Sequence, residues 1–363
     1  MTVAIDTTPL AGEPTGIGRY VMHLVEALGA LPEPPKLLRY VVSRRATGLD
    51  PDVVRLHYPA TVAVRLWGHV GLASGHGRLS GADVVHGTNY VAPPTGRPTV
   101  LTVHDCTFVT HPQWCRPVVR AFAPVVRRAI SRGAWIHTPS QYVADQVGEL
   151  FGTDRVVVVH HGPPDPLPDP ATLPKVIGLH DRPFVLALGG IEHRKNLVGL
   201  IEAFGLFHRD HPEMQLVIAG PDGPARPDVD AAIGRLAPAA SSSVVLTGWL
   251  DEPHRIAALT HASVLAYPSI EEGFGLPILE GMAAGVPVVG GNAGSIPEVA
   301  GDAALLVDPN DPGALAEALA RAIDDDDLRT HLAAAGRLRL GEYSWERCAA
   351  GLMELYGRTG WEG

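Results

Sequence analysis

The feature that most constrains the fold is the stretch over residues 263–289, which runs from an apolar segment through a glycine-rich turn into a helix. Residues 263–268 have the composition of a buried strand. The helix is predicted to begin near Leu276 or Pro277, because proline fits the first helical turn, where its missing N–H is not needed. A helix N-terminus presents backbone N–H groups and a positive dipole end to an anion. The stretch therefore predicts a strand, turn and helix that can hold a phosphate group.

Two carboxylates flank this turn. Glu272 lies at its mouth, followed by Gly273, Phe274 and Gly275, and Glu280 lies about one helical turn inside the helix. At this spacing both carboxylates can face one ligand. An alternative is that the two acids only cap the helix and meet solvent, but the convergence of several suitable groups favours a site. We therefore predict a ligand that carries both a phosphate and a sugar.

Short apolar runs alternate with helical patterns along the whole chain, which is typical of parallel, doubly wound α/β sheets. The predicted strands, some with their terminal glycine turns, are 3–5, 38–42, 53–56, 83–86, 98–103, 134–137, 156–162, 184–188, 215–221, 244–250 and 263–268. A chain of 363 residues exceeds what one core usually absorbs, and the proline-rich run 163–170 is typical of a semi-rigid connector. We expect an N-terminal domain over 1–165, a C-terminal domain over 175–342 and a terminal helical segment over 343–363.

In the N-terminal half, polar and glycine residues follow the strands at the ends where open α/β sheets bind ligands. His104 follows the strand 98–103, and an imidazole there can donate a hydrogen bond to a sugar hydroxyl or polarise a leaving oxygen. Gly16 and Gly18 are predicted in a loop between the first strand and a helix that runs through Leu28. Glycines at such a place let the backbone approach a ligand closely.

Two alternatives remain for this half. His86, His104 and Asp105 are able to form a metal site, although no tight ligand motif such as H-E-x-x-H supports one. The basic stretch 116–132 is able to lie on an anionic membrane surface. A packed helix with a solvated basic face is the more common form of such a stretch, and Pro124 is expected to interrupt it.

The C-terminal half begins with a second candidate group. Gly189 and Gly190 end the strand 184–188, and Arg194 and Lys195 precede a predicted helix over 197–209. Arginine can bind a diphosphate with two parallel hydrogen bonds, and lysine adds a point charge. The alternative is a pair of solvated surface charges. Their position next to a glycine turn favours an anion clamp.

Composition excludes several classes of protein. The formal net charge of −10 disfavours nucleic acid as the main partner, because binding to a phosphate backbone needs a basic face. The three cysteines, Cys106, Cys115 and Cys348, form no paired pattern, as in a reduced cytosolic protein. The first residues lead directly into a strand without a basic leader, and no apolar run reaches the length of a membrane span. We expect a cytoplasmic protein, with the inner face of the membrane as an alternative location.

The motifs described above resemble those of a known enzyme family. Glu272 and Glu280 have the E-x7-E spacing of retaining glycosyltransferases, and residues 272–289 follow the pattern E-G-F-G-L-P-x-L-E-x-M-A-x-G-x-P-V-V. The chain is thus similar to glycosyltransferase family 4, and in particular to its mannosyltransferase- and rhamnosyltransferase-like members, from about Asp6 to Tyr356. The resemblance implies a GT-B fold, in which two Rossmann-like domains face each other across a cleft. The first domain would bind the acceptor, the second the nucleotide sugar, and the terminal helix would cross back to the first.

The resemblance also implies a role for individual residues. Arg194 and Lys195 would bind the donor diphosphate, Glu272 the hydroxyls of the donor sugar and Glu280 those of the ribose, with His104 near the scissile bond. The implied catalytic set is His104, Glu272, Arg194 and Lys195. The implied donor-binding set is Gly16, Gly18, Gly189, Gly190, Arg194, Lys195, Gly248, Trp249, Leu250, Glu272, Gly273, Phe274, Gly275, Leu276 and Glu280.

The chain departs from the family pattern at two places. Many family members carry arginine where this chain has Gly190, so Arg194 is a candidate to replace that arginine. His161 and Gly162 stand where the family usually has an N-G-V-D-like turn.

The function implied by the resemblance is transfer of a hexose from a nucleotide diphosphate sugar to a hydroxyl group, with retention at the anomeric carbon. No cofactor or metal is expected, since no D-x-D motif stands at a strand end. GDP-mannose is the favoured donor, followed by UDP-glucose, UDP-N-acetylglucosamine or a deoxysugar nucleotide, and the acceptor is a polysaccharide, a lipid-linked sugar or a small natural product. Glu272 as a covalent nucleophile is an alternative to its binding role. The alternative functions are a nucleotide-sugar epimerase, a sugar phosphorylase and a non-catalytic binding protein.

Overall fold

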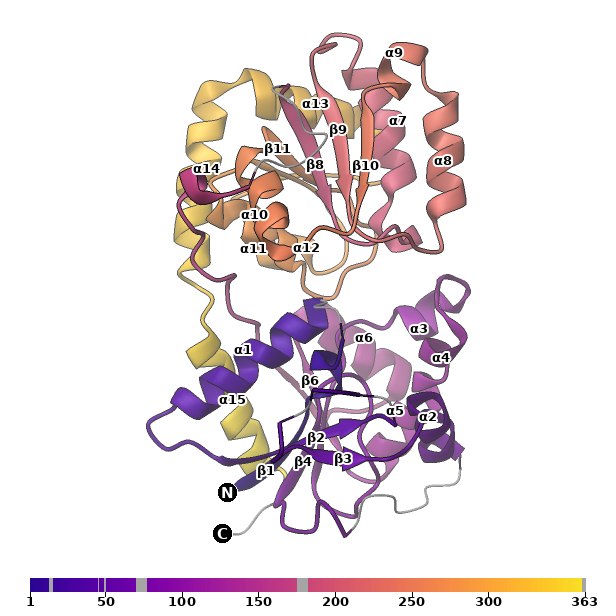
Figure 1. The fold of residues 1–363 in the computed structure, drawn as a ribbon, viewed down its shortest axis with the longest axis vertical. Coiled ribbons are helices and arrows are strands. Elements are labelled where there is room, and N and C mark those ends of the chain that lie inside the picture. The colour runs from indigo at the N-terminus through magenta and orange to yellow at the C-terminus, as the bar shows by residue number, and fades with distance from the viewer. Residues whose placement is uncertain (13–15, 45, 49, 70–76, 175–181, 361–363) are drawn as a thin grey trace. The chain divides into compact units, whose positions relative to one another are not determined.

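The computed structural model describes residues 1–12, 16–44, 46–48, 50–69, 77–174 and 182–360 (Figure 1). The chain divides into two compact units: the N-terminal unit combines Met1–Gly162 with Tyr343–Gly363, and the C-terminal unit is Pro163–Glu342. Each unit contains one parallel sheet with helices packed against it. The predicted fold class, two doubly wound Rossmann-like α/β domains, is therefore confirmed. Thr15, which belongs to the predicted glycine loop, lies outside the described residues.

The N-terminal unit is built on a 7-stranded sheet in the order β3-β2-β1-β4-β5-β6-β7. Every pairing between these strands is parallel. The strand order reverses between β1 and β4, and in open α/β sheets ligands bind at the carboxyl ends of the strands beside such a switch point. The strands are β1 (Thr2–Asp6), β2 (Lys36–Val42), β3 (Val54–Leu56), β4 (Val84–Gly87), β5 (Thr99–Thr102), β6 (Trp135–Thr138) and β7 (Val156–Val158).

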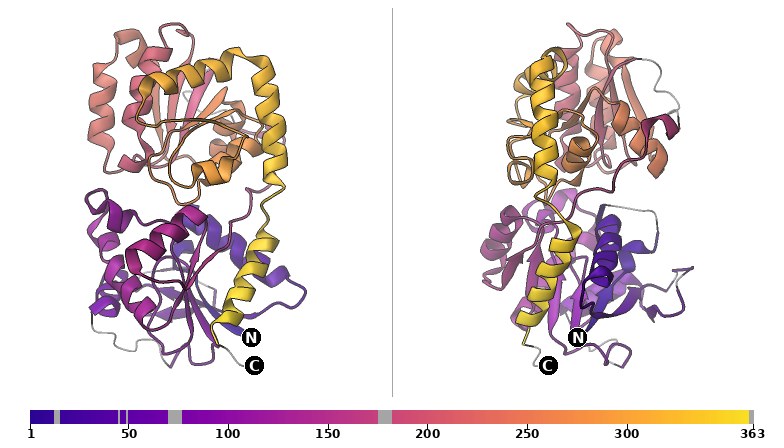
Figure 2. Two further views of the ribbon diagram at one scale, coloured as in Figure 1. Left: turned by 180° about the vertical axis from the view of Figure 1, so that it is seen from behind. Right: turned by 90° about the vertical axis from the view of Figure 1, so that its left-hand side faces the viewer.

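Helices cover both faces of this sheet because alternate strand residues point to opposite sides. Val3 and Ile5 of β1 pack with α1 and α15, whereas Ala4 belongs to the cluster formed with α2, α5 and α6. In Figures 1 and 2, α15 lies beside α1, in agreement with their direct packing. The helices are α1 (Gly16–Ala30), α2 (Ala60–His69), α3 (Thr107–Thr110), α4 (Pro117–Arg120), α5 (Phe122–Ser131), α6 (Gln141–Phe151) and α15 (Trp345–Arg358).

Capping residues fix where two of these helices begin. The Ser140 side chain accepts a hydrogen bond from the Val143 N–H at the start of α6, and the Ser344 side chain accepts one from the Arg347 N–H at the start of α15. The second cap lets the chain leave the C-terminal unit and form the last helix of the N-terminal unit.

The C-terminal unit is built on a 6-stranded parallel sheet in the order β10-β9-β8-β11-β12-β13. Its switch point lies between β8 and β11. The strands are β8 (Phe184–Leu188), β9 (Gln215–Ala219), β10 (Val244–Gly248), β11 (Val264–Tyr267), β12 (Val288–Gly291) and β13 (Leu305–Val307). The helices are α7 (Leu197–Phe207), α8 (Arg226–Arg235), α9 (Pro238–Ser241), α10 (Glu252–His261), α11 (Leu276–Ala283), α12 (Ile296–Ala300), α13 (Pro312–Asp324) and α14 (Asp326–Leu340).

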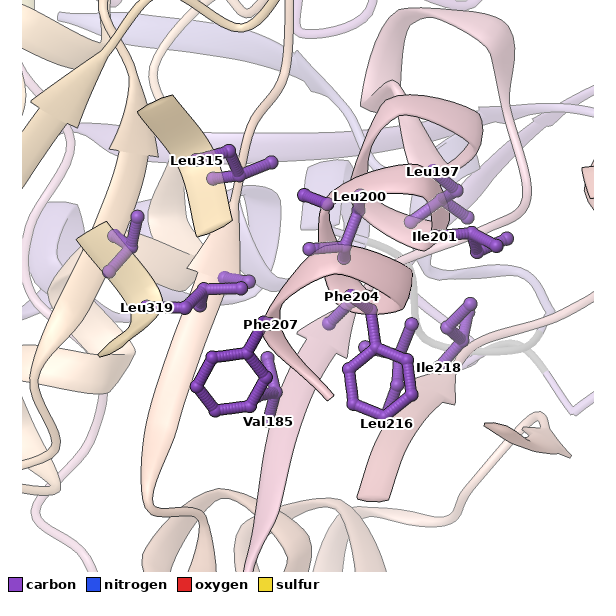
Figure 3. Packing of buried hydrophobic residues seen from close by; sticks show 14 of the residues in the cluster. Val185, Leu197, Leu200, Ile201, Phe204, Phe207, Leu216, Ile218, Leu315 and Leu319 are labelled. Carbon is purple, nitrogen blue, oxygen red and sulfur yellow. The ribbon is translucent and has the colours of Figure 1, made fainter. Parts of the chain in front are cut away.

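The helix α7 forms the centre of the hydrophobic core in this unit (Figure 3). Leu200 and Phe204 are completely buried between the sheet and α13. Val185 of β8 and Leu319 of α13 belong to the same cluster. Because α7 is apolar around most of its surface, it can only be stable when covered on several sides. This core anchors the loop between β8 and α7, which carries Arg194.

Two predictions about the N-terminal unit are wrong. Gly16 and Gly18 lie in the first turn of α1 and not in a loop before it. The basic stretch 116–132 does not form one helix interrupted at Pro124, because the break lies at Ala121 and Pro124 belongs to the first turn of α5. Proline is tolerated in that turn, where N–H groups have no helical partner. Among the described residues, no helix has the length and hydropathy needed to cross a membrane.

A glycine of α11 provides a test of how closely this helix packs on the sheet. A Cβ atom at Gly281 would lie 2.8 Å from side-chain atoms of both Leu265 and Val288. We expect Gly281→Ala to lower the free energy of unfolding by about 1–3 kcal/mol, because the core must shift to admit one methyl group. Calorimetric unfolding measures this change.

The matched control is Gly234→Ala in α8, where a Cβ atom meets no other atom within 4 Å. This substitution is expected to stabilise the protein by about 0.5–1 kcal/mol, because alanine loses less backbone entropy in a helix than glycine does. Equal effects of the two substitutions would contradict the close packing of α11.

Candidate functional site

Two cations and a phenol converge on one carboxylate oxygen in the C-terminal unit. Arg194 Nη1 donates to Glu272 Oε2 at 2.7 Å, and Lys195 Nζ donates to the same oxygen at 2.6 Å. The Tyr267 hydroxyl donates to this oxygen at 2.5 Å and accepts a hydrogen bond from Lys195 Nζ. Arg194 Nε also donates to Glu192 at 2.8 Å. We call Arg194, Lys195, Tyr267 and Glu272 the clamp network.

Loops at the carboxyl ends of β8 and β11 bring the clamp network together. Gly189 has a φ of +126°, and a Cβ atom there would lie 3.4 Å from Lys195 Cε, so the glycine gives the lysine side chain its room. The Ile270 N–H donates to the Arg194 carbonyl at 2.9 Å, and the Ser295 N–H donates to the Glu272 carbonyl at 3.0 Å. The two loops and the start of α12 therefore hold each other in place by backbone hydrogen bonds.

The charges of the clamp network stabilise one another. Burial alone would raise the pKa of Glu272, but Arg194 and Lys195 outweigh it and lower that pKa to about 2. Burial lowers the pKa of Lys195, an effect that the charge of Glu272 opposes. Burial, and next the charge of Glu272, raise the pKa of Tyr267 well above its usual value, so its hydroxyl stays protonated and donates. At neutral pH the network therefore holds one carboxylate, two cations and a neutral phenol.

Glu280 is held by a different arginine. It is only 3% exposed, and its Oε2 accepts a hydrogen bond from Arg255 Nη1 at 2.7 Å. The other nitrogens of Arg255 donate to Glu252 at 2.6 and 2.8 Å. The two carboxylates of the E-x7-E spacing thus have separate cationic partners, although the charge of Glu280 also contributes to the raised pKa of Tyr267.

The remaining predicted donor-binding residues of the C-terminal unit lie in loops at the same edge of its sheet, whereas Gly16 and Gly18 lie in α1 of the N-terminal unit. Gly275 has a φ of +90° and is the N-cap of α11, directly before Leu276, and Phe274 is buried beside it. Gly248 ends β10 with a φ of +69°, and its carbonyl accepts a hydrogen bond from the Gly220 N–H at 2.9 Å. Trp249 follows with half of its surface exposed. Gly189, Gly190, Leu250 and Gly273 lie in these same loops after β8, β10 and β11.

In the N-terminal unit, His104 follows β5 and is buried. Its Nε2 lies 2.9 Å from the Thr88 carbonyl, which can only accept, so Nε2 carries the proton of the neutral ring. Burial lowers the pKa of His104 to about 4, and the ring is therefore neutral near pH 7. Nδ1 is then an acceptor. The geometry favours a histidine that accepts a hydrogen bond from a hydroxyl group over one that donates to it.

Aromatic and polar side chains surround this histidine. The ring of Tyr90 lies 5.5 Å from that of His104, centroid to centroid, and the ring of Tyr20 lies 5.2 Å from it. Tyr90 has a φ of +64°, which is rare for a bulky residue, and its hydroxyl donates to Asp105 at 2.9 Å. Strained residues of this kind concentrate at functional sites.

The alternative metal site is not assembled by these side chains. Nδ1 of His86 forms a hydrogen bond with the Tyr356 hydroxyl at 2.7 Å, and its Nε2 forms one with the Thr102 hydroxyl at 2.8 Å. Asp105 accepts from the Thr107 N–H at 2.9 Å as well as from Tyr90. His86, His104 and Asp105 thus each have a protein partner.

Sequence reasoning missed four residues of these sites. Tyr267 and Arg255 complete the two networks around Glu272 and Glu280, and Tyr90 packs against His104. Asp6 ends β1 at the switch point of the N-terminal sheet, where burial raises the pKa of its carboxyl to about 6 against the opposing hydrogen bonds from Thr8. The last residue of an apolar strand was a usable signal for Asp6 and Tyr267. No local signal identifies Arg255 as the partner of Glu280.

Comparison with solved structures identifies the fold. Sucrose-phosphate synthase from Thermosynechococcus elongatus is similar over 99% of this chain and 98% of its own, with a TM-score of 0.74 and 21% identity. Anabaena Alr3699/HepE, crystallised with UDP and glucose, is similar over 99% of this chain and 100% of its own, with a TM-score of 0.74 and 18% identity. At such identities the likeness concerns the fold, which is that of GT-B glycosyltransferases.

Comparison with protein families then places the chain. The family model described as Glycosyltransferase Family 4 matches residues 14–163, and the one described as Glycosyl transferases group 1 matches residues 171–339. The chain is therefore a glycosyltransferase whose N-terminal unit belongs to Glycosyltransferase Family 4 and whose C-terminal unit belongs to the glycosyl transferases of group 1. This confirms the family resemblance seen in the sequence.

Two curated relatives illustrate the range of this family. O-antigen chain mannosyltransferase B of Escherichia coli is 28% identical over 98% of this chain and 99% of its own length. Alpha-maltose-1-phosphate synthase of Mycolicibacterium smegmatis is 35% identical over 56% of this chain and 57% of its own.

The clamp network makes the stability of the C-terminal unit depend on pH. The pKa of Glu272 in the folded protein lies below its usual 4.5, so its stabilising contribution is present above pH 4.5 and is lost as the pH falls towards about 2. We expect Glu272→Gln to reduce the free energy of unfolding by about 3 kcal/mol at neutral pH, because Lys195 loses its carboxylate partner and Arg194 loses one of its two. The difference from wild type should shrink below pH 4.5, as thermal unfolding over a pH series would measure.

Glu202→Gln is the matched control for this experiment. Glu202 is an exposed carboxylate of the same unit that pairs with Arg235 at 3.2 Å. Its removal should change the free energy of unfolding by less than about 0.5 kcal/mol at every pH. A difference between wild type and Glu272→Gln that stays constant with pH would show that the ionisation of Glu272 does not stabilise the fold.

Proposed function

We propose that this glycosyltransferase transfers a hexose from a nucleotide diphosphate sugar to a hydroxyl group, with retention of the anomeric configuration. The observation that carries the proposal is the clamp network. Arg194 and Lys195 both lie within 2.7 Å of one carboxylate oxygen at the carboxyl edge of the second sheet. Two converging cations that hold a carboxylate there are also suited to hold phosphate oxygens, which are negatively charged acceptors as well.

Donor binding would redistribute the contacts of the clamp network. The diphosphate would take Arg194 and Lys195 as partners, and the Glu272 carboxylate would then accept hydrogen bonds from the donor sugar's hydroxyls. The N-terminus of α11 adds a favourable dipole for the phosphates. Glu280, oriented by Arg255, would accept hydrogen bonds from the ribose hydroxyls. The backbone of residues 247–250 would hold the base, as the family resemblance implies.

Catalysis in this proposal rests on stabilising the departing diphosphate. The transition state is oxocarbenium-like, and negative charge grows on the leaving group, where Arg194 and Lys195 stabilise it without rearrangement. The diphosphate itself would accept the proton of the acceptor hydroxyl. His104 would contribute an acceptor nitrogen for a sugar hydroxyl from the N-terminal unit. A binding role for Glu272 is preferred to a nucleophilic one, because its pKa near 2 makes it a weak base.

The donor proposed first is GDP-mannose. O-antigen chain mannosyltransferase B is similar to this chain over nearly the full length of both, which supports mannose. A nucleotide diphosphate glucose is the second candidate, supported by the structural likeness to Alr3699/HepE with UDP and glucose. The acceptor is proposed to be a polysaccharide, a lipid-linked sugar or a small molecule, and the reaction to need no metal and to take place in the cytoplasm.

Nucleotide binding tests the donor site directly. We expect calorimetry with GDP, UDP and TDP to detect tight binding of one nucleotide, with the same affinity in the presence of a chelator. Glu280→Ala should weaken binding of that nucleotide by about tenfold or more, because the ribose loses a charged acceptor. Glu252→Gln is the matched control, since Glu252 shares Arg255 but is not proposed to touch the ligand. The absence of binding by all three nucleotides would overturn the proposed function.

Turnover with the selected nucleotide sugar tests the catalytic role of the clamp network. Lys195→Met should lower kcat by about 100-fold or more, because the leaving diphosphate loses one stabilising charge. The exposed Arg235→Met is the control and should keep wild-type activity. Proton NMR of the first product should show the anomeric configuration of the donor. An inverted product would contradict retention, and wild-type turnover by Lys195→Met would contradict the role of the clamp network.

A further inference from the structure

A second cluster of cations lies in the N-terminal unit, around a cavity of about 400 Å³. Its lining includes Arg97 and Thr99 at the start of β5, Gly133 before β6 and Arg155 before β7. These strands are parallel, so the cavity lies at their amino ends. His104 follows the carboxyl end of β5, at the opposite edge of the same sheet. The cavity is therefore separate from the candidate site of this unit.

The lining of this cavity contains four arginines and no acidic residue. These are Arg97, Arg128, Arg132 and Arg155. Within the part of the chain that the structure describes, Arg97 and Arg155 donate only to the backbone carbonyls of Ser80 and Gly133, and Arg132 forms no ion pair. By contrast, Arg39 of the same unit pairs with both Asp50 and Asp52. Arg97, Arg132 and Arg155 thus have no carboxylate partner among the described residues. Neighbouring cations repel one another, and an anion would relieve that repulsion.

The walls of the cavity are rigid and partly apolar. Pro93, Pro94 and Pro98 fix the backbone of the loop before β5, and Trp67 contributes a buried ring. Gly133 has a φ of +88°, and a Cβ atom there would lie 3.0 Å from Arg155 Nη1, so the glycine allows the guanidinium to lie over the backbone. The centroid of the Trp135 ring lies 6.0 Å from Cζ of Arg155.

Helix electrostatics explain only part of this cluster. Arg128 and Arg132 lie at the carboxyl end of α5, where cations are favoured by the helix dipole. Arg97 and Arg155 come from the segments before β5 and β7, so no helix dipole accounts for their position. We propose that the cavity binds a phosphate group, carried by a soluble phosphate ester or by a lipid headgroup. Guanidinium groups match phosphate oxygens with paired hydrogen bonds, and the apolar wall leaves room for an organic substituent.

Binding of inorganic pyrophosphate to the full chain tests this proposal. We expect calorimetry to detect two sites in the wild type, one in the clamp network and one in the arginine cavity. The double variant Arg97→Gln/Arg155→Gln should weaken binding at the cavity by about tenfold or more. Lys195→Met should weaken binding at the clamp network. Arg65→Gln, an exposed arginine of α2 that does not line the cavity, is the matched control and should bind as wild type does. Hydrogen exchange should show protection by pyrophosphate at residues 95–99 and 133–135.

Vesicles distinguish the two sources of phosphate. Phosphatidylglycerol vesicles that bind the wild type and Arg65→Gln, but not the double variant, would support the cavity with a lipid headgroup as its ligand. If the wild type and Arg65→Gln bind pyrophosphate at the cavity, the double variant does not, and none of them binds vesicles, the ligand would be a soluble phosphate ester. The proposal is overturned if the double variant binds both probes as the wild type does, if neither probe binds the wild type, or if protection is confined to the C-terminal unit.

Discussion

The candidate site of the C-terminal unit depends on the shared oxygen of one carboxylate. Two cations and a phenol bond to Glu272 Oε2, and none of the three charges would be stable in this buried position alone. Backbone hydrogen bonds to Arg194 and Glu272 hold the loops in register, so the charges meet without further adjustment. In the proposed function, a phosphate that enters would replace Glu272 as a partner of both cations. The interaction that stabilises the site would then also set the free energy that a donor has to supply.

The carboxyl edge of the N-terminal sheet carries a group of buried, neutral histidines. His86, His104 and His137 are buried, and burial lowers the pKa of each, so all three rings are neutral at physiological pH. Their ring nitrogens bond to hydroxyls and backbone carbonyls. A set of neutral donors and acceptors is suited to hydroxyl groups, and the cations of the other unit are suited to phosphates. The two carboxyl edges therefore differ in chemistry, which fits the roles that the family resemblance implies, with the acceptor on the first domain and the donor on the second.

Local signals in the sequence were sufficient for the alternation of strands and helices and for three of the four residues in the clamp network. Arg194 and Lys195 follow a short apolar run and two glycines, and Glu272 follows another apolar run and precedes Gly273. The carboxyl ends of parallel strands bring such residues together. The start of α1 was misjudged because glycines fit a loop and a first helical turn equally well. Tyr267 and Arg255 were missed for another reason. Arg255 lies 25 residues from Glu280 and Tyr267 lies 72 residues from Lys195, so only the packed fold makes these pairs neighbours. The second partner of Tyr267, Glu272, lies only 5 residues away.

The arginine cavity shows why composition describes partners incompletely. A net charge of −10 argues against a polyanion bound over the whole surface, but it says nothing about a pocket a few residues wide. Arg97, Arg132 and Arg155 come from separate segments, and the amino ends of β5, β6 and β7 bring them together. A parallel sheet gathers distant residues at both of its edges. Attention to the carboxyl edge alone, where ligands of this fold usually bind, would overlook a second group of functional residues at the other edge.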